Sequence, residues 1–468
     1  MKMPGVVLTV MTVAKIEVCM KNDIEIFSLL PKEKKEAVAL LSLGTFLEYF
    51  DLMLYVHMAV LLNDIFFPKT DPHTALLISA LAFCSSYMLR PLGAMIFGYI
   101  GDHFGRKITV VITTFIMAFA CFVMAILPTY AKIGIAAAWI VTICRALQGL
   151  ASMGELTGAQ LYIAEIMKPP ARYLGVSLMA ICTSLGTTFA LFIAYLVTAL
   201  EVNWRFAFLF GAIIAVIGSF ARTGLRETPE FADAKRRIKN ITDKSRANIN
   251  VLNDNAYMKE NIKFKTILAL ILCDLMWPIS SYFSYIYCGT ILKTSFGFTA
   301  TEVIKENFMI SIVKLLFMIF VVYLNYKNHP LKIAKKLLYS FVFIVIVTPT
   351  LMYFDNNPDN LLLMRFLIVT TETSFLISPI KFMHVPVFKR FTSISLSFAF
   401  SHIFGYIVSS FSIVYMIERF NYWGVTVMIL PVAIGYMWAI LYFEKLEKES
   451  GNFLPNQNDG LCVPVQNV

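Results

Sequence analysis

The chain has 468 residues, of which 58% are hydrophobic and 14% aromatic, and its formal net charge is +10. This apolar content exceeds that of a soluble globular protein of the same length and predicts that most of the chain lies in lipid. A basic chain could bind nucleic acid, but most of its 40 Lys and Arg residues fall in the loops on one side of the apolar segments. The charge therefore indicates membrane topology and excludes a nucleic acid partner.

Twelve apolar segments are long enough to cross a bilayer, which takes about 20 residues of helix. In chain order they are 37–62, 74–100, 108–128, 134–160, 173–199, 204–222, 265–292, 303–325, 337–354, 361–380, 393–416 and 423–443. The alternation of apolar and polar residues that marks a membrane barrel does not recur, so the spans are expected to be helices. The predicted fold class is an all-α polytopic membrane protein, and the positive-inside rule places both termini in the cytoplasm.

A polar stretch between the sixth and seventh spans divides the chain into two sets of six helices. The predicted parts are a cytoplasmic tail (1–36), an N-terminal six-helix bundle (37–222), a cytoplasmic loop (223–264), a C-terminal six-helix bundle (265–443) and a cytoplasmic tail (444–468). Such halves are typical of transporters in which the solute binds between two repeats. Residues 1–20 lack a convincing cleavage site, so a signal peptide is not expected, and the sequence leaves open whether they belong to the protein.

Charged and polar residues occur inside the spans of the first half, where each charge costs about 2.5–3.5 kcal/mol on insertion scales unless it finds a partner. They are Glu48, Asp51 and Tyr55 in the first span, Arg90 in the second, and Arg145, Gln148 and Glu155 in the fourth. Their spacing places each set on one helix face. We predict that Glu48 or Asp51 pairs with Arg90 or Arg145, leaves one carboxylate able to take a proton, and lines a substrate cavity. The alternative is that these charges only fix the packing of the helices.

The second half offers fewer candidates for the cavity. Asp274 in the seventh span and Lys314 in the eighth are the best of them, because an intramembrane charge tends to face the interior of the bundle. The weaker candidates are Trp277, Tyr282, Tyr285, Glu372 and His402. Trp277 precedes Pro278, which is expected to kink the seventh span. No residues have the spacing of a metal site, and no cofactor is expected.

The turn between the second and third spans, GYIGDHFGRK at 98–107, is the most distinctive motif. Gly101 and Gly105 permit close backbone approach, and Asp102 and Arg106 place opposite charges at two helix ends. The equivalent place in the second half holds NYKNHPLKIAKK at 325–336, which is basic but lacks the Asp and both glycines.

GYIGDHFGRK resembles the loop motif between helices two and three of the major facilitator superfamily. GTFLEYFDLMLY (44–55), LRPLGAMIFGYIGDHFGRK (89–107), RALQGLASMGELTGAQLYIAE (145–165) and NWRFAFLFGA followed by LRETPEF are similar to its metabolite:proton symporters, which include proline/betaine, citrate, 2-oxoglutarate and shikimate transporters. In the second half, VPVFKRFTSISLSFAF (385–400) resembles the start of the family's helix eleven.

The resemblance implies the major facilitator fold, a monomer in the plasma membrane, most simply a bacterial inner membrane, and a cytoplasmic gate. In the superfamily the Asp and Arg of this motif contact the other bundle when the cavity opens outward, which assigns the gate to Gly101, Asp102, Gly105 and Arg106. The alternative for this turn is a short basic loop without a gating role.

The function predicted from the residues and the resemblance together is proton-coupled symport of a small carboxylated or zwitterionic solute, with a proline/betaine-like osmolyte favoured. A symporter of a di- or tricarboxylate and a transporter-derived sensor without flux are the alternatives. An enzyme is disfavoured, since the extramembrane segments contain no phosphate-binding loop, nucleophile elbow or His/Cys cluster. The expected partners are the solute, a proton and the lipid bilayer, and the sequence leaves Na⁺ open as the coupling ion.

Overall fold

The structure, a computed structural model, describes residues 32–67, 87–169, 171–200, 203–223 and 261–451. Most of the two predicted tails, most of the predicted central loop and the first part of the second predicted span lie outside the described residues. The LRETPEF motif (225–231) also lies outside them.

The first half is built of long helices that match the predicted spans. They are α2 (Lys32–Phe66), α4 (Arg90–His103), α5 (Arg106–Ile126), α7 (Ile135–Ile166), α8 (Ala171–Ala199) and α9 (Arg205–Arg222), with the short α6 (Tyr130–Ile133) before α7. A turn of two residues, Phe104 and Gly105, joins α4 to α5. Gly105 has φ of +128°, a conformation that glycine adopts without steric cost.

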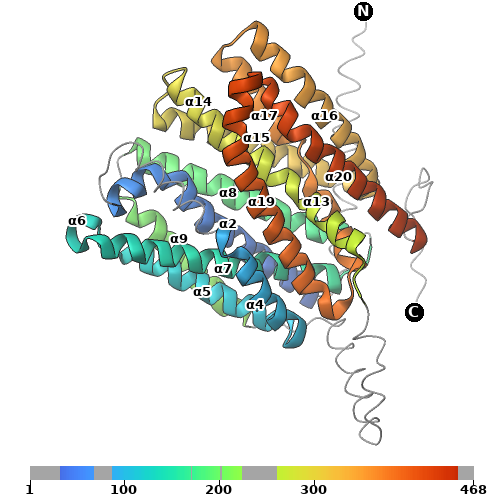
Figure 1. The fold of residues 1–468 in the computed structure, drawn as a ribbon. Coiled ribbons are helices and arrows are strands. Elements are labelled where there is room, and N and C mark those ends of the chain that lie inside the picture. Colours follow the sequence, from blue (N-terminus) through green and yellow to red (C-terminus); the bar gives the residue numbers. More distant parts are fainter. Residues whose placement is uncertain (1–31, 68–86, 170, 201–202, 224–260, 452–468) are drawn as a thin grey trace, which may run out of the picture.

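The second half repeats the arrangement with two broken helices. Its elements are α13 (Phe264–Ser281), the π-helix Tyr282–Tyr287, α14 (Cys288–Thr294), α15 (Ala300–Lys327), α16 (Pro330–Phe354), α17 (Pro358–Thr371), α18 (Ser378–Lys381), α19 (Val387–Phe420) and α20 (Trp423–Glu449). Figure 1 shows the first half (blue to green) below the second half (yellow to red).

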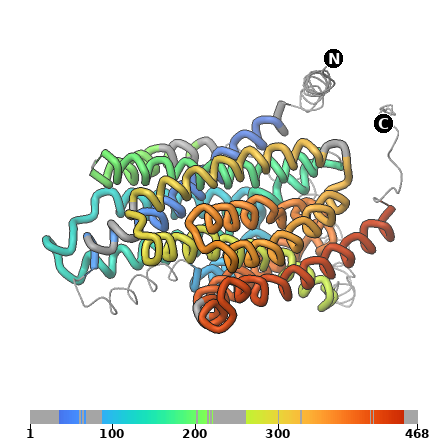
Figure 2. The backbone as a smooth tube through the Cα atoms, turned by 90° about the horizontal axis from the view of Figure 1, so that it is seen from above, coloured from blue at the N-terminus to red at the C-terminus, as the bar shows by residue number. Residues whose placement is uncertain are grey.

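These helices form the predicted all-α polytopic fold. Within the described residues ten helical segments are long and apolar enough to cross a membrane, and α4 and α9 stand at the second and sixth predicted spans. Most of the long helices run along one common direction (Figure 2). Large apolar side chains such as Phe119, Trp139 and Phe343 are exposed on the outside of the bundle, which fits a surface solvated by lipid.

The seventh span is interrupted after Pro278. A proline has no amide hydrogen to donate to the carbonyl four residues earlier, and the π-helix begins at Tyr282, one turn further on. The sequence predicted a kink at this proline.

The tenth span was predicted as one helix over 361–380, and this is wrong. Helix α17 ends at Thr371, and short 3₁₀ and α segments run from Ser374 to His384. Glu372 Oε1 accepts a hydrogen bond from the amide of Ser374 at 2.9 Å, and Pro379 follows without an amide hydrogen. Both features divert backbone hydrogen bonding from a continuous helix.

The halves meet along two pairs of helices, α4 with α19 and α8 with α15. One apolar core lies within the first half around Phe50, Leu54 and Met58. The core of the second half continues into the first half through Val110, Tyr173 and other residues near the α4–α5 turn. We call the end of the bundle that holds this turn the motif end. The apolar core is continuous between the halves at the motif end.

Candidate transport cavity and its closure at the motif end

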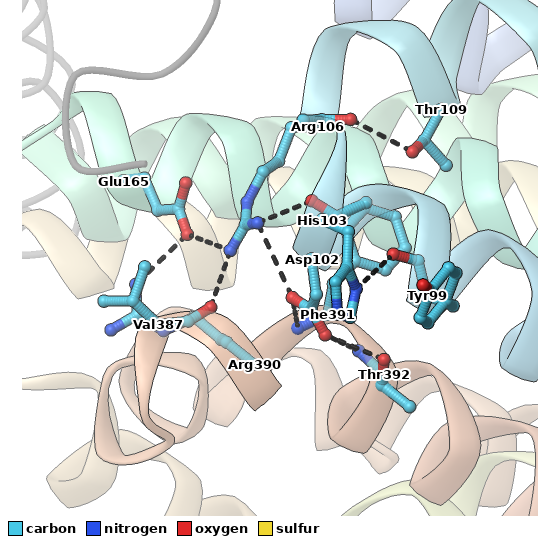
Figure 3. Close-up of polar contacts among 12 residues, drawn as sticks. Tyr99, Asp102, His103, Arg106, Thr109, Glu165, Val387, Arg390, Phe391 and Thr392 are labelled. Carbon is cyan, nitrogen blue, oxygen red and sulfur yellow. Dashed lines mark hydrogen bonds and ion pairs between the residues drawn. The ribbon is translucent and has the colours of Figure 1, made fainter. Parts of the chain in front are cut away.

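Asp102, at the end of α4, reaches across to α19 of the second half (Figure 3). Its carboxylate accepts hydrogen bonds from the amide of Phe391 at 3.1 Å and the amide of Thr392 at 2.9 Å. The Thr392 hydroxyl donates a third bond at 2.7 Å. Three bonds to one buried carboxylate fix the position of α19 relative to α4, because charge-assisted hydrogen bonds are short and strong.

Arg106, the first residue of α5, is fully buried and also crosses to the second half. Its Nη1 donates to the carbonyl oxygen of Gly101 at 2.7 Å and lies 3.5 Å from the Asp102 carboxylate. Its Nη2 donates to Glu165 Oε1 at 3.1 Å and to the carbonyl oxygen of Val387 at 2.9 Å. One guanidinium therefore ties together α4, α5, α7 and α19.

Glu165, at the end of α7, is shared by two cations. Its Oε1 lies 3.1 Å from Arg106 Nη2 and 3.1 Å from Arg390 Nη1 of α19. We call Asp102, Arg106, Glu165 and Arg390 the crossing cluster. The sequence analysis identified Asp102 and Arg106 but missed Glu165 and Arg390. Both lie in segments that resemble the family, at 145–165 and 385–400. A signal was available, since both carry a charge at the edge of an apolar span.

The glycines of α4 allow this close contact. A Cβ atom at Gly101 would lie 2.5 Å from the ring of Phe391, and one at Gly98 would lie 2.8 Å from the Cα atom of Thr392. Any larger residue at either position would separate α4 from α19. The predicted close approach at Gly101 is therefore an approach to the other half.

Between the halves lies a cavity of about 1200 Å³. Its lining runs from Phe382 and Ile394 near the motif end to Thr198, Lys293 and Thr294 at the opposite ends of α8 and α14. At the motif end the crossing cluster and the continuous apolar core lie between the halves. The geometry is that of a central cavity closed at the motif end.

Charged side chains of the second half line the cavity. Asp274 of α13 forms a buried ion pair with Lys381 of α18. The ammonium of Lys314 lies 3.3 Å from the ring centroid of Trp277, a cation–π contact. Glu372 also lines the cavity. The structure thus places the predicted Asp274 and Lys314 at the cavity surface.

Comparison with known proteins is consistent with this geometry. The family model described as Major Facilitator Superfamily matches residues 41–385. The chain belongs to the major facilitator superfamily. It is 36% identical over 221 residues to the inner membrane metabolite transport protein YhjE of Escherichia coli (strain K12), covering 45% of this chain and 50% of that protein. It is 32% identical over 204 residues to the proline/betaine transporter of Salmonella typhimurium, covering 42% of this chain and 41% of that protein.

The aligned part of the chain spans about half the length of the curated relatives it matches or less. Solved structures extend the likeness to the whole fold. The MFS proton:xylose symporter XylE bound to 6-bromo-6-deoxy-D-glucose has a TM-score of 0.70 over 87% of this chain and 95% of its own, at 15% identity. The human organic anion transporter MFSD10 has a TM-score of 0.60 at 13% identity, over 88% of this chain and 100% of its own. These relatives are transporters and not enzymes.

In this major facilitator protein the predicted charges of the first half lie behind the cavity wall. Tyr49, Met53 and His57 of α2 line the cavity, whereas Glu48 and Asp51 lie on the other side of that helix. The residues predicted for the cavity but absent from its lining are Glu48, Asp51, Tyr55, Arg90, Arg145, Gln148 and Glu155. On α2, the helical period of 3.6 residues turns Glu48 and Asp51 about half a turn away from Tyr49, Met53 and His57.

The basic residues among them contact neighbours within the first half. Arg145 Nη1 donates to Gln148 Oε1 at 2.9 Å, and its guanidinium lies 4.3 Å from the ring centroid of Tyr55. Arg90 lies 4.4 Å from the ring centroid of Tyr87. The cations expected to receive a solute are thus held against aromatic rings of their own half.

Asp51 faces α9, where a Cβ atom at Gly211 would lie 2.2 Å from its carboxylate. Within the described residues no Lys or Arg lies within ion-pair distance of Asp51, so the predicted pairing of Asp51 with Arg90 or Arg145 is wrong. The pairing predicted for Glu48 stays a prediction, as does a role for either carboxylate in coupling.

The segment 325–336, which holds the turn between α15 and α16 at Asn328 and His329, makes contacts of another kind. Glu447 of α20 contacts His384 Nε2 at 2.6 Å and His329 Nε2 at 3.9 Å. Glu444, one turn earlier on α20, forms an ion pair with Lys335 of α16. We call His329, Lys335, His384, Glu444 and Glu447 the α20 cluster. These three ion pairs join elements of the second half.

Within the described residues no group of three or more His, Cys, Asp or Glu side chains is placed to hold a metal ion.

Proposed function

We propose that this protein is a secondary active transporter that moves a small carboxylated or zwitterionic solute together with a proton by alternating access. The observation that carries the proposal is the cavity between the halves, which is closed at the motif end by the crossing cluster. The positive-inside rule assigns the motif end to the cytoplasm, so this conformation faces outward. The membrane would then be a plasma membrane, with both termini in the cytoplasm, as expected for a bacterial inner membrane protein.

In this proposal the crossing cluster, with Gly101 and Gly105, is the cytoplasmic gate. Opening the cavity to the cytoplasm requires α19 to leave α4, which breaks the bonds of Asp102 to Phe391 and Thr392. Closure at the outer end would supply compensating contacts once solute is bound.

The named relatives support the solute class and the coupling ion. A proline/betaine transporter is among the relatives, and a proton:xylose symporter shares the fold. A proton gradient is a sufficient source of energy, because one charge moved through 100 mV releases about 2.3 kcal/mol, or about fiftyfold in concentration. Asp51, buried and without a cationic partner in the described residues, is the proposed proton acceptor.

Uptake into proteoliposomes under an imposed pH gradient tests this function. Labelled proline and betaine should accumulate, and a protonophore should abolish the accumulation. Accumulation of citrate or 2-oxoglutarate in their place would identify a carboxylate symporter, a sodium gradient as the driving force would exclude proton coupling, and binding without flux would identify a sensor.

Replacement of the proposed proton acceptor separates coupling from binding. Asp51→Asn should abolish accumulation driven by the pH gradient and leave exchange of internal for external solute intact. The matched variant Glu48→Gln tests the neighbouring carboxylate of α2. If Asp51→Asn accumulates solute like the wild type, Asp51 is not the acceptor.

A further inference from the structure

Two opposite charges from different helices face the cavity of this transporter, and they attract each other without forming an ion pair. Lys314 lies on α15 and Glu372 follows the end of α17, and both are largely buried, with 7% and 4% exposed. Within the described residues neither takes part in an ion pair shorter than 4 Å. Asp274 and Lys381, which also line the cavity, neutralise each other.

The aromatic ring that holds Lys314 leaves its charge available. Trp277 attracts the ammonium through the face of its ring, so the contact fixes the position of Lys314 and adds no negative charge. The three N–H donors of an ammonium can then bind a carboxylate. Lys314 is therefore positioned to bind one anionic group in the cavity.

Glu372 is held in a comparable way. Its Oε1 accepts a hydrogen bond from the backbone amide of Ser374 at 2.9 Å, in the break between α17 and the following 3₁₀ segment. This hydrogen bond fixes the carboxylate at the cavity surface. The break in the tenth span, which sequence reasoning missed, is what places this side chain.

We propose that Lys314 binds the carboxylate and Glu372 the ammonium of a zwitterionic solute, and that this pair of charges selects zwitterions over dicarboxylates. A dicarboxylate on Lys314 would bring its second negative charge toward Glu372, which like-charge repulsion disfavours. Tyr282 and Tyr285 also line the cavity, and their rings can contact a quaternary ammonium. The inference rests on the proposed function and narrows it to one class of solute.

The test uses ligands that lack one charge each. Binding of proline, betaine, pyrrolidine (no carboxylate), cyclopentanecarboxylate (no amine) and 2-oxoglutarate is measured on the purified protein, together with proline uptake in proteoliposomes. Lys314→Met should weaken proline binding about tenfold or more and leave pyrrolidine binding unchanged, because only proline has a carboxylate to bind the Lys314 ammonium. Glu372→Gln should weaken the binding of proline and leave the binding of cyclopentanecarboxylate unchanged, because only proline has an ammonium. The Gln side chain should keep its position, since its oxygen can still accept the hydrogen bond from the Ser374 amide.

Lys314→Arg and Lys305→Met are the controls. The first keeps a cation over Trp277 and should retain most of the preference for proline over pyrrolidine. The second removes an exposed cation of the same helix, outside the cavity lining, and should bind proline like the wild type. Size-exclusion profiles check that each variant is folded.

The outcomes separate this inference from the proposed function. Wild-type accumulation of proline with an unchanged proline-to-pyrrolidine ratio in Lys314→Met would overturn the inference and leave symport standing. Stronger wild-type binding of 2-oxoglutarate than of proline and betaine would also overturn it. Failure of the wild type to accumulate any solute under a proton or sodium gradient would instead refute the proposed transport.

Discussion

The α4–α5 turn and the α15–α16 turn hold equivalent places in the two halves, yet their contacts differ in reach. From the first turn, Asp102 and Arg106 bind Thr392 and Val387 of α19, in the other half. Around the second turn, His329 and Lys335 bind glutamates of α20, in their own half. The second turn also contacts the first half, where the rings of Tyr173 and His329 lie 5.6 Å apart.

This difference teaches that closure at the motif end is asymmetric. Bonds between halves must break whenever the halves separate, whereas bonds within a half move with it. Variants of the crossing cluster should therefore change the conformational equilibrium, and variants of the α20 cluster should change stability.

The largest effect is expected for Arg106→Gln. The change removes a buried guanidinium that binds Gly101, Glu165 and Val387 and leaves Glu165 with one cation fewer. Loss of one member of a buried charge network costs about 3–5 kcal/mol, which should open the motif end. The measurement is maleimide labelling, from the motif end, of a cysteine placed at Ile394 in a cysteine-free background. Unchanged labelling would show that the crossing cluster does not hold the halves together.

The counterpart in the second half is Glu447→Gln. We expect a loss of about 1.5–3 kcal/mol in the stability of the purified protein, because the charge-assisted contact with His384 is lost. Labelling at Ile394 should stay at the wild-type level, since the contact lies within one half. Glu449→Gln, on the same helix but exposed, is the matched control. Increased labelling in Glu447→Gln would remove the distinction between the two clusters.

Gly101→Ala tests the close approach of α4 and α19 without altering a charge. The added Cβ atom meets the Phe391 ring at 2.5 Å, and overpacking of this kind costs about 1–3 kcal/mol. Labelling at Ile394 should rise, and Phe391→Leu in the same chain should restore it in part. A double variant that labels as strongly as Gly101→Ala alone would place the effect elsewhere.

The smallest effect is expected for Lys335→Met. Its partner Glu444 retains Lys448 at 2.9 Å, and the Lys335 side chain is 25% exposed. A partly exposed pair contributes about 1 kcal/mol or less, so thermal stability should change little and transport should not change. A loss of transport would indicate that the α15–α16 turn also takes part in gating.

Much of the fold could be predicted from the sequence, because crossing lipid imposes length and apolarity on every span. Twelve segments were predicted on that ground alone, and ten candidate spans lie within the described residues. The tenth was misjudged, since apolar composition does not reveal that Glu372 caps a backbone amide and that Pro379 lacks one.

The candidate site was predicted less completely. The residues of the α4–α5 turn are readable because two glycines and two charges at fixed spacing stand out in an apolar chain. Their partners on α19 lie more than 280 residues away in sequence, and no local pattern joins Asp102 to Thr392.

The sequence by itself determined that this is a helical membrane protein of two halves with a specialised turn at one end, because these properties follow from composition and local spacing. Only the tertiary structure decided which charges face the cavity. Arg145 and Lys314 are both intramembrane cations in the sequence, and the rotation of each helix against its neighbours buries the first behind the wall and turns the second toward the cavity. That rotation is set by packing between distant segments, which local sequence does not encode.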